Sequence, residues 1–284
     1  MNKPKKVDSK EIGLEMGLLA GKHLFNTEHM HYGIWKKGME VNILNLPKAQ
    51  ENHSDFIIQN IPKGVRTILD VGCGVGALAA KLTRKGYQVD CVSPLTLLSE
   101  YARQRLGTDA RIYETRYEDL QTNQRYDMIL FSESFQYVPI AKALEKSYLF
   151  LNENGYLLVC DFFQTDAAGK SALGGGHKFS EFSAAMEVNP FRLVSDRDIT
   201  GETAPNIRIV NDILMNVGKP VWNRIFLYME YRHSVIAGFL KWKFRKKIDK
   251  INSKYFSGER NEENFRIYKT YRLMLFQKVK SSQP

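Results

Sequence analysis

An apolar run that leads into three alternating glycines constrains the fold of this chain more than any other feature. Residues 68–71 read ILDV, and Gly72, Gly74 and Gly76 precede a helix-like segment at 77–82. This order predicts a strand, a tight turn and a helix, because residues without a Cβ turn sharply and let a ligand approach the backbone. The first turn of a helix has free N–H groups that bind polar or anionic groups. We therefore expect a small polar cofactor on this turn.

A second predicted strand follows the glycine turn. The first strand, residues 66–71, is the short apolar run that a buried parallel strand requires. A predicted helix then ends at Gly86, and residues 87–93 form the next strand. Strand, helix and strand at this spacing form a βαβ unit, in which ligands bind at the carboxyl ends of the strands. The sequence therefore predicts an α/β protein.

The spacing of the glycines resembles that of one enzyme family. A dinucleotide-binding turn reads GxGxxG, whereas residues 70–76 read DVGCGVG. This segment resembles motif I of the class I S-adenosylmethionine-dependent methyltransferases. The resemblance implies a Rossmann-like, doubly wound sheet of seven strands, mostly parallel with an antiparallel last strand, and S-adenosyl-L-methionine as the cofactor. It also implies that Gly72 and Gly74 pack on the cofactor and that Asp70 orients the loop or meets the ligand's amino group.

An aromatic segment before the turn resembles the same family. HYGIW, residues 31–35, is similar to a segment of sterol, tocopherol and cyclopropane-type methyltransferases whose aromatic residues close over the methionine end of the cofactor. Aromatic faces attract cations such as a sulfonium, so the resemblance implies this role for Tyr32 and Trp35. The alternative is an aromatic pair that packs on the edge of the domain.

Three later segments resemble the fourth, fifth and sixth strands of the family. They are residues 126–138, 154–161, which open on an Asn-Gly turn signal, and 192–200. Together with the earlier motifs, they imply the following cofactor-binding residues: Tyr32, Trp35, Asp70, Gly72, Cys73, Gly74, Gly76, Ser93, Tyr117, Glu118 and Ser132.

Two positions depart from the family pattern. Ser93 stands where an acid usually ends the second strand and holds the ribose, although cyclopropane-type members also lack that acid. Arg116 stands where an acid commonly meets the adenine amino group. Tyr117 and Glu118 are the nearest candidates for that contact.

The predicted elements divide the chain into four parts. Residues 1–61 form a helical segment that closes over the cofactor, and 62–200 form the cofactor-binding α/β core. Residues 201–266 form a helical insertion, and 267–284 form the final strand and tail. Because an insertion of this size lies above the strand ends, we expect it to be a substrate lid.

Composition limits where the protein acts. The chain has 284 residues, 43% of them hydrophobic, which suits a globular protein. Cys73, Cys91 and Cys160 lie on or beside predicted buried strands, and their spacing suggests neither disulfides nor a zinc site. No secretory leader is visible, and no apolar run approaches the roughly 20 residues that span a bilayer. We expect a cytoplasmic protein with no bound metal.

Positive charge is concentrated near the C-terminus. Residues 241–280 contain thirteen Lys or Arg and four Asp or Glu, which gives +9 of the total of +10. Within residues 239–250, basic residues alternate with apolar and aromatic ones. Such a surface can bind nucleic-acid phosphates, anionic lipid headgroups or an acidic partner, or can be a solvated helix. Among the functional alternatives we favour peripheral contact with an anionic membrane surface, because the aromatics lie on the apolar side of the pattern.

Methyl transfer from a sulfonium depends mainly on positioning in an unsolvated pocket, but some acceptors also need a base. His177 is the first candidate, because residues 174–176 are glycines that let its loop close and a neutral imidazole accepts a proton near neutral pH. A surface histidine without a role is the alternative. The other candidate bases or orienting groups are Asp198, Glu133, His29 and His31.

The sequence says less about the methyl acceptor. Residues 132–135 read SESF where methyltransferases of exocyclic base amines carry N/D-P-P-Y. The resemblance implies a small molecule, including lipidic and natural-product compounds, that is methylated on O, C or N. Two alternatives stay open: an RNA-modifying methyltransferase, which the basic tail favours, and a non-catalytic S-adenosylmethionine-binding module, which Ser93 and Arg116 favour.

Overall fold

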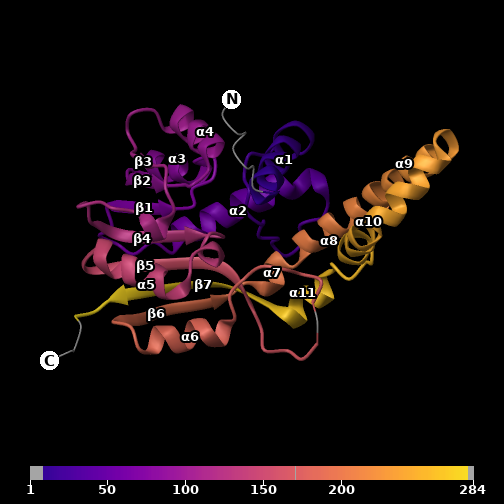
Figure 1. The fold of residues 1–284 in the computed structure, drawn as a ribbon. Coiled ribbons are helices and arrows are strands. Elements are labelled where there is room, and N and C mark those ends of the chain that lie inside the picture. The colour runs from indigo at the N-terminus through magenta and orange to yellow at the C-terminus, as the bar shows by residue number, and fades with distance from the viewer. Residues whose placement is uncertain (1–8, 170, 281–284) are drawn as a thin grey trace.

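A seven-stranded sheet forms the centre of the computed structural model, which describes residues 9–169 and 171–280 (Figure 1). The strands are β1 Thr67–Val71, β2 Gln88–Val92, β3 Ile112–Tyr113, β4 Tyr126–Ser132, β5 Leu151–Gln164, β6 Phe191–Asp198 and β7 Lys269–Lys278. Their order is β3-β2-β1-β4-β5-β7-β6, and β1 to β5 pair in parallel. β7 is antiparallel to both β5 and β6. The predicted α/β fold with an antiparallel last strand is confirmed.

Helices flank the sheet on both faces (Figure 1). Those before β6 are α1 Ser9–Leu24, α2 Leu46–Gln59, α3 Ala77–Arg84, α4 Thr96–Leu106, α5 Ile140–Phe150 and α6 Phe179–Glu187. Those between β6 and β7 are α7 Thr200–Thr203, α8 Pro205–Ile213, α9 Lys219–Arg232, α10 Ser234–Tyr255 and α11 Glu262–Tyr268. Short 3-10 turns occur at Ile43–Asn45, Tyr117–Asp119 and Phe135–Tyr137, and a π-helical turn at Leu214–Gly218 joins α8 to α9. In the described chain, no helix combines the length and apolarity needed to cross a bilayer.

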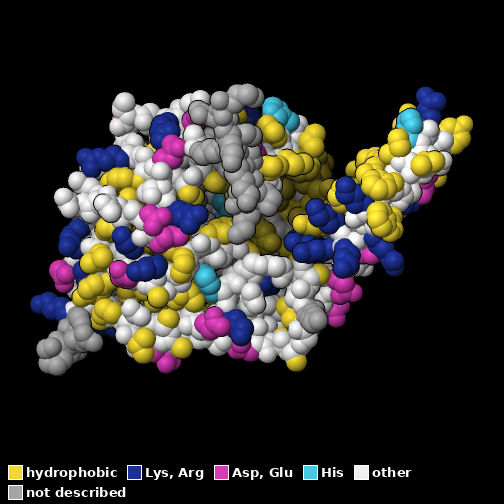
Figure 2. All heavy atoms as spheres, viewed as in Figure 1, with side chains coloured by type: hydrophobic (Ala, Val, Ile, Leu, Met, Phe, Trp, Pro, Cys, Tyr) yellow, Lys and Arg dark blue, Asp and Glu magenta, His cyan; other side chains and the backbone are white. Residues whose placement is uncertain are grey.

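Helices α9 and α10 form a hairpin that projects away from the sheet (Figure 1), and we call residues 219–255 the arm. The two helices contact each other through Lys241, which pairs with Glu230 and lies 5.5 Å from the ring centre of Phe226. Of the arm's residues, only Ala237 is buried. Figure 2 shows hydrophobic and basic side chains side by side along the arm. The predicted insertion is therefore helical, and most of the arm's surface faces solvent.

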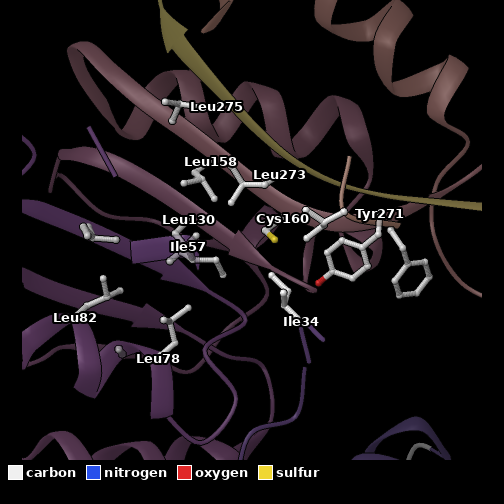
Figure 3. Close-up of a cluster of buried hydrophobic side chains, with 14 of the residues drawn as sticks. Ile34, Ile57, Leu78, Leu82, Leu130, Leu158, Cys160, Tyr271, Leu273 and Leu275 are labelled. Carbon is white, nitrogen blue, oxygen red and sulfur yellow. The ribbon is translucent and has the colours of Figure 1, made fainter. Parts of the chain in front are cut away.

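Successive residues of the central strands point to opposite faces of the sheet, as the pleat requires. Leu130 belongs to a buried cluster with side chains of α2 and α3, including Ile57 and Leu82 (Figure 3). Its neighbour Phe131 belongs to a second cluster with side chains of α5 and α6. Because both faces are covered, the strands are near-continuous apolar runs, which is why they could be found in the sequence.

The turn expected at Asn154 and Gly155 lies inside a strand instead of before one. β5 begins at Leu151, which pairs with Tyr126, and the pairing then resumes between Tyr156 and Met128. Asn154 has a φ of 61°, and a Cβ on Gly155 would lie 2.9 Å from a backbone oxygen. The Asn-Gly signal therefore marks an interruption in the pairing of β5 with β4, which a local pattern cannot distinguish from a turn between elements.

We expect Leu130→Ala to lower the free energy of unfolding by about 2–5 kcal/mol, because its fully buried side chain would leave a cavity. Urea denaturation followed by circular dichroism measures this change. Leu44→Ala is the matched control, since Leu44 is 85% exposed and its truncation should change stability by less than about 0.5 kcal/mol. Equal losses in the two variants would contradict the assigned core.

Candidate cofactor-binding site

A cavity of about 540 Å³ opens at the carboxyl ends of β1, β2 and β4. Its walls are the segments that follow these strands, together with residues 116–118 after β3, residues 28–31 and Leu14 of α1. Ligands bind at this edge in open α/β sheets, because the loops there converge. A second cavity of about 770 Å³ lies beside it, lined by α3 and by charged residues of neighbouring segments. That cavity does not include the glycine turn, so the first is the candidate site.

The glycine turn holds its shape through close contacts that exclude side chains. Gly72 has a φ of 76°, and a Cβ there would lie 2.4 Å from the Cβ of Ser134. Ser134 in turn donates a hydrogen bond to the carbonyl oxygen of Val71. A Cβ on Gly74, by contrast, would meet only the Sδ of Met30, at 3.7 Å. The turn is therefore packed tightly against Ser134 at Gly72, whereas its backbone at Gly74 is accessible to a ligand.

Three buried polar atoms of residues in the cavity wall lack a hydrogen-bond partner in the described structure. They are Nδ1 of His29, Oδ2 of Asp70 and Oγ of Ser132. Burial raises the pKa of Asp70 to about 7. Unpaired buried groups cost free energy, and a ligand with an ammonium and hydroxyl groups would supply the missing partners. S-adenosylmethionine carries such groups, so the residues present fit it.

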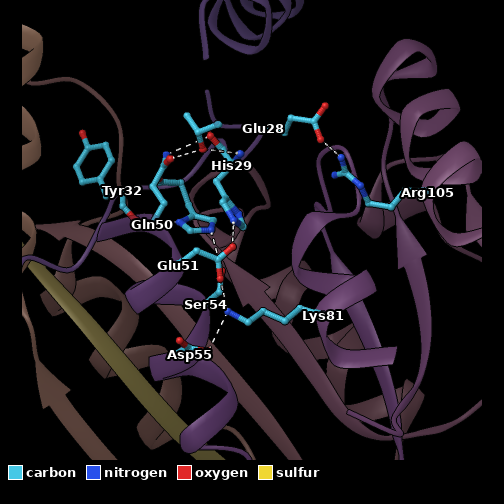
Figure 4. Close-up of polar contacts among 11 residues, drawn as sticks. Glu28, His29, Tyr32, Gln50, Glu51, Ser54, Asp55, Lys81 and Arg105 are labelled. Atoms are coloured by element: carbon cyan, nitrogen blue, oxygen red, sulfur yellow. Dashed lines mark hydrogen bonds and ion pairs between the residues drawn. The ribbon is translucent and has the colours of Figure 1, made fainter. Parts of the chain in front are cut away.

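The segment between α1 and α2 is fixed against the cavity by polar contacts (Figure 4). Glu28 pairs with Arg105 of α4, and His29 Nε2 lies 2.9 Å from an oxygen of Glu51 in α2. Gln50 of α2 donates hydrogen bonds from Nε2 to the backbone oxygens of His29 at 3.1 Å and His31 at 2.7 Å. The result is a rigid wall made of His29, Met30 and His31.

The two aromatic residues expected over the cofactor are packed in the core. The Tyr32 ring stacks on Phe162 with a centroid distance of 5.9 Å. Trp35 is buried with Ala49 and Ile209. Neither side chain lines the cavity, whereas Met30, which the sequence did not single out, does. Their proposed contact with the cofactor stays a prediction.

Most of the other expected cofactor-binding residues meet at the cavity. Those that line it are Asp70, Gly72, Cys73, Gly74, Ser93, Tyr117, Glu118 and Ser132, together with Arg116. Gly76 is instead the N-cap residue of α3 and lies against Ala102 of α4. Residues such as Leu95 and Tyr137 also line the cavity. These two residues could not be predicted from the sequence, because apolar and aromatic residues occur throughout the chain.

Glu133 is held at the end of β4 in an uncommon conformation. Its φ is 55°, in the left-handed region. Its Oε1 accepts hydrogen bonds from the backbone N–H of Tyr32 at 2.6 Å and from the hydroxyl of Tyr271 at 2.8 Å. Burial raises the pKa of Glu133 to about 8, and the carboxyl of Asp161 adds to this rise. Glu133 is thus a fixed carboxyl group in the cavity wall that can exchange a proton near neutral pH.

The other two expected catalytic residues lie outside the cavity wall. His177 Nε2 is 2.9 Å from the backbone oxygen of Val138 and 3.2 Å from that of Phe135. Because both neighbours are acceptors, this nitrogen carries a hydrogen. Asp198 accepts a hydrogen bond from the N–H of Thr200 at 2.9 Å and pairs with Arg272. Catalytic roles for His177 and Asp198 stay predictions.

Comparisons with known proteins agree with this geometry. The profile of a family described as "Methyltransferase domain" matches residues 68–155. The chain is 26% identical over 243 residues to the ubiquinone biosynthesis O-methyltransferase of Rickettsia canadensis (strain McKiel), which covers 76% of this chain and 98% of that protein. The corresponding protein of Rickettsia prowazekii (strain Madrid E) is 23% identical over 227 residues, 73% of this chain and 86% of that protein.

A solved structure shares the fold. Geranyl diphosphate C-methyltransferase from Streptomyces coelicolor A3(2), crystallised with S-adenosyl-L-homocysteine, superposes with a TM-score of 0.66 over 97% of this chain and 100% of that one. The two sequences are 16% identical. At this identity the likeness shows the fold and leaves the acceptor open.

We expect Gly74→Arg to abolish binding of S-adenosylmethionine, because the new side chain would enter the cavity. Isothermal titration calorimetry measures the affinity. Gly86→Arg is the matched control: both glycines have positive φ, so both substitutions strain the backbone, but Gly86 lies after α3 with open space around its Cα. Retained affinity in Gly74→Arg, or equal loss in both variants, would refute the assigned site.

Proposed function

We propose that this chain, which belongs to the class I S-adenosylmethionine-dependent methyltransferases, methylates a hydroxyl group of an apolar small molecule and uses Glu133 as the base. The cofactor, when bound, supplies a methyl group activated by its sulfonium. Asp70, Ser132 and the backbone at Gly74 would hold it. The observation that carries the proposal is the position of Glu133, a fixed carboxyl group in the wall of the same cavity as the glycine turn.

The hydrogen bonds of Glu133 favour a role in proton transfer. Both bonds end on Oε1, so among the described residues Oε2 has no protein donor and is free to accept a proton. A neutral amine can attack through its lone pair, whereas a hydroxyl becomes a strong nucleophile only as its proton leaves. The proton would move to Glu133 as the oxygen–methyl bond forms. The names of the curated relatives, which are O-methyltransferases, support this choice.

The apolar part of the cavity wall favours an apolar acceptor. Leu14, Met30, Tyr137 and Val138 line the cavity beside its polar residues. These side chains exclude water, which strengthens the effect of a buried base. Compounds of this kind partition into membranes, and contact of residues 239–250 with an anionic membrane surface is part of the proposal. The substrate-lid role of residues 201–266 stays a prediction, since none of the described residues of this insertion lines the cavity.

Labelled cofactor tests the proposed acceptor. The protein is incubated with methyl-labelled S-adenosylmethionine and fractionated cell extract, and the product is identified by mass spectrometry. We expect label on oxygen in the organic-solvent fraction. Label on carbon would reject the hydroxyl acceptor, label in RNA would favour the nucleic-acid alternative, and cofactor binding without turnover would favour a binding module.

With that product in hand, Glu133→Gln tests the base. We expect kcat to fall by about 10²- to 10⁴-fold with little change in cofactor affinity, because the amide keeps the shape and cannot accept the proton. His177→Gln is the comparison, since it removes the imidazole of the base expected from the sequence. A larger loss in His177→Gln than in Glu133→Gln would transfer the role to His177.

The pH dependence of turnover should report Glu133. A base acts in its ionised form, so activity should be lost as the pH falls through the pKa of Glu133, which burial raises to about 8. Tyr271→Phe removes a hydrogen bond that lowers this pKa, and should therefore move the inflection to higher pH while activity at high pH is retained. Asp161, His53 and Cys160 also neighbour this pair and are unchanged in the variant. A uniform loss at every pH would contradict this assignment.

A further inference from the structure

The arm exposes large apolar side chains over much of its length. Tyr231 is 86% exposed, Val235 84% and Trp242 75%. Others that are at least half exposed are Val221, Ile225, Leu227, Tyr228, Ile236 and Phe239. Isolated exposed apolar residues are ordinary, but a contiguous set marks a surface that binds something. The arm therefore presents an apolar surface that the rest of the described chain leaves uncovered.

The apolar and basic residues of the arm are arranged in sequence from its tip. The turn at His233 joins the two helices, and the exposed apolar residues Tyr231, Val235 and Ile236 lie within three residues of it, together with the cation Arg232. The basic run of α10 begins at Lys241. At a rise of about 1.5 Å per residue, Lys241 lies roughly 9 Å along the helix from Val235. This spacing matches the roughly 5–10 Å by which interfacial helices enter the headgroup and acyl boundary.

The net charge of the arm indicates which kind of partner it binds. The arm contains ten Lys or Arg and two acids, Glu230 and Asp249, a net charge of +8. Two copies of such an arm would repel each other, which disfavours self-association. The phosphates of a nucleic acid would pair with the basic residues of the arm, but the apolar residues at its tip would remain in water. An anionic lipid surface can bind both the basic and the apolar residues of the arm. Trp242 and Tyr231 are also residue types that prefer the membrane interface.

The arm is attached on the side of the sheet where the carboxyl ends of the strands, and therefore the cavity, lie. β6 runs parallel to β5, because both pair antiparallel with β7. The carboxyl end of β6, from which α7 leads to the arm, therefore lies at the same edge as the carboxyl ends of β1 and β4 (Figure 1). A surface bound by the arm is thus on the cavity side of the molecule.

From these observations we infer that the arm anchors the protein to anionic bilayers, with the tip in the headgroup and acyl boundary and the basic run of α10 on lipid phosphates. This anchoring does not depend on which atom of the acceptor is methylated. It deepens the proposed membrane contact of residues 239–250 by assigning the apolar contact to the tip of the hairpin.

Vesicle flotation of the full chain tests the inference without any acceptor. We expect binding to vesicles of phosphatidylglycerol and phosphatidylcholine, weak binding to phosphatidylcholine alone, and release at high salt, because exposed charges are screened. The emission of Trp242 should shift to the blue on binding, and Trp242→Phe should remove that shift. Absence of binding, or equal binding to neutral vesicles, would overturn the inference.

Two sets of variants test the apolar contact of the tip and the ionic contact of the basic run separately. Tyr231→Ser with Val235→Ser should weaken partitioning by about tenfold or more, because apolar burial is lost. Lys243→Gln with Lys246→Gln and Lys247→Gln should remove the preference for anionic lipid. Val188→Ser is the matched control, since Val188 is 83% exposed on the body. Unchanged cofactor affinity shows that each variant is folded.

Competing partners give different results in the same experiments. A second copy would appear as a concentration-dependent dimer in sedimentation that the tip variant abolishes. RNA retention that survives the tip substitutions and is lost in the basic variants, without vesicle binding, would indicate a nucleic-acid surface. Either outcome would overturn the membrane assignment.

Discussion

The contact between Gly72 and Ser134 sets the geometry on which the rest of the site depends. A Cβ at Gly72 would overlap the Ser134 side chain, so the turn after β1 and the loop after β4 approach more closely than side chains allow. The hydrogen bond from Ser134 to Val71 closes the same junction. Because Asp70 precedes this junction and Glu133 adjoins it, one backbone approach places the buried carboxyl group of Asp70 and the candidate base at a single cavity.

The sequence was informative wherever structure is determined by neighbouring residues. Buried strands are mostly apolar, so β1 and β2 were predicted to within one residue of their observed ends. β4 begins at Tyr126, the first residue of the segment that resembles the family's fourth strand, but it ends at Ser132, before that segment does. The glycine turn could be located because Gly72 and Gly74 need positive φ angles that other residues rarely adopt. Most of the expected cofactor-binding residues follow strand ends, and parallel strands bring those ends together.

The sequence was less informative where distant segments decide the outcome. Tyr32 looked suited to bind a cation, but its backbone N–H meets Glu133, 101 residues away, and its ring packs on Phe162. The partner of Glu133 from β7, Tyr271, is 138 residues away. The Asn-Gly pair at 154 signalled a turn before a strand, and only the pairing of β5 with β4 shows that it interrupts the ladder within β5. No local pattern encodes such contacts.

The place of β7 in the sheet has a consequence for synthesis. β7 is made after β5 and β6, yet it lies between them in the sheet and carries Tyr271, which donates a hydrogen bond to Glu133. Until residues 269–278 leave the ribosome, β5 and β6 have no partner on their facing sides, and the nascent chain exposes two open sheet edges of the kind that aggregate. The sheet therefore closes, and Glu133 gains its tyrosine partner, only after the insertion between β6 and β7 has been synthesised.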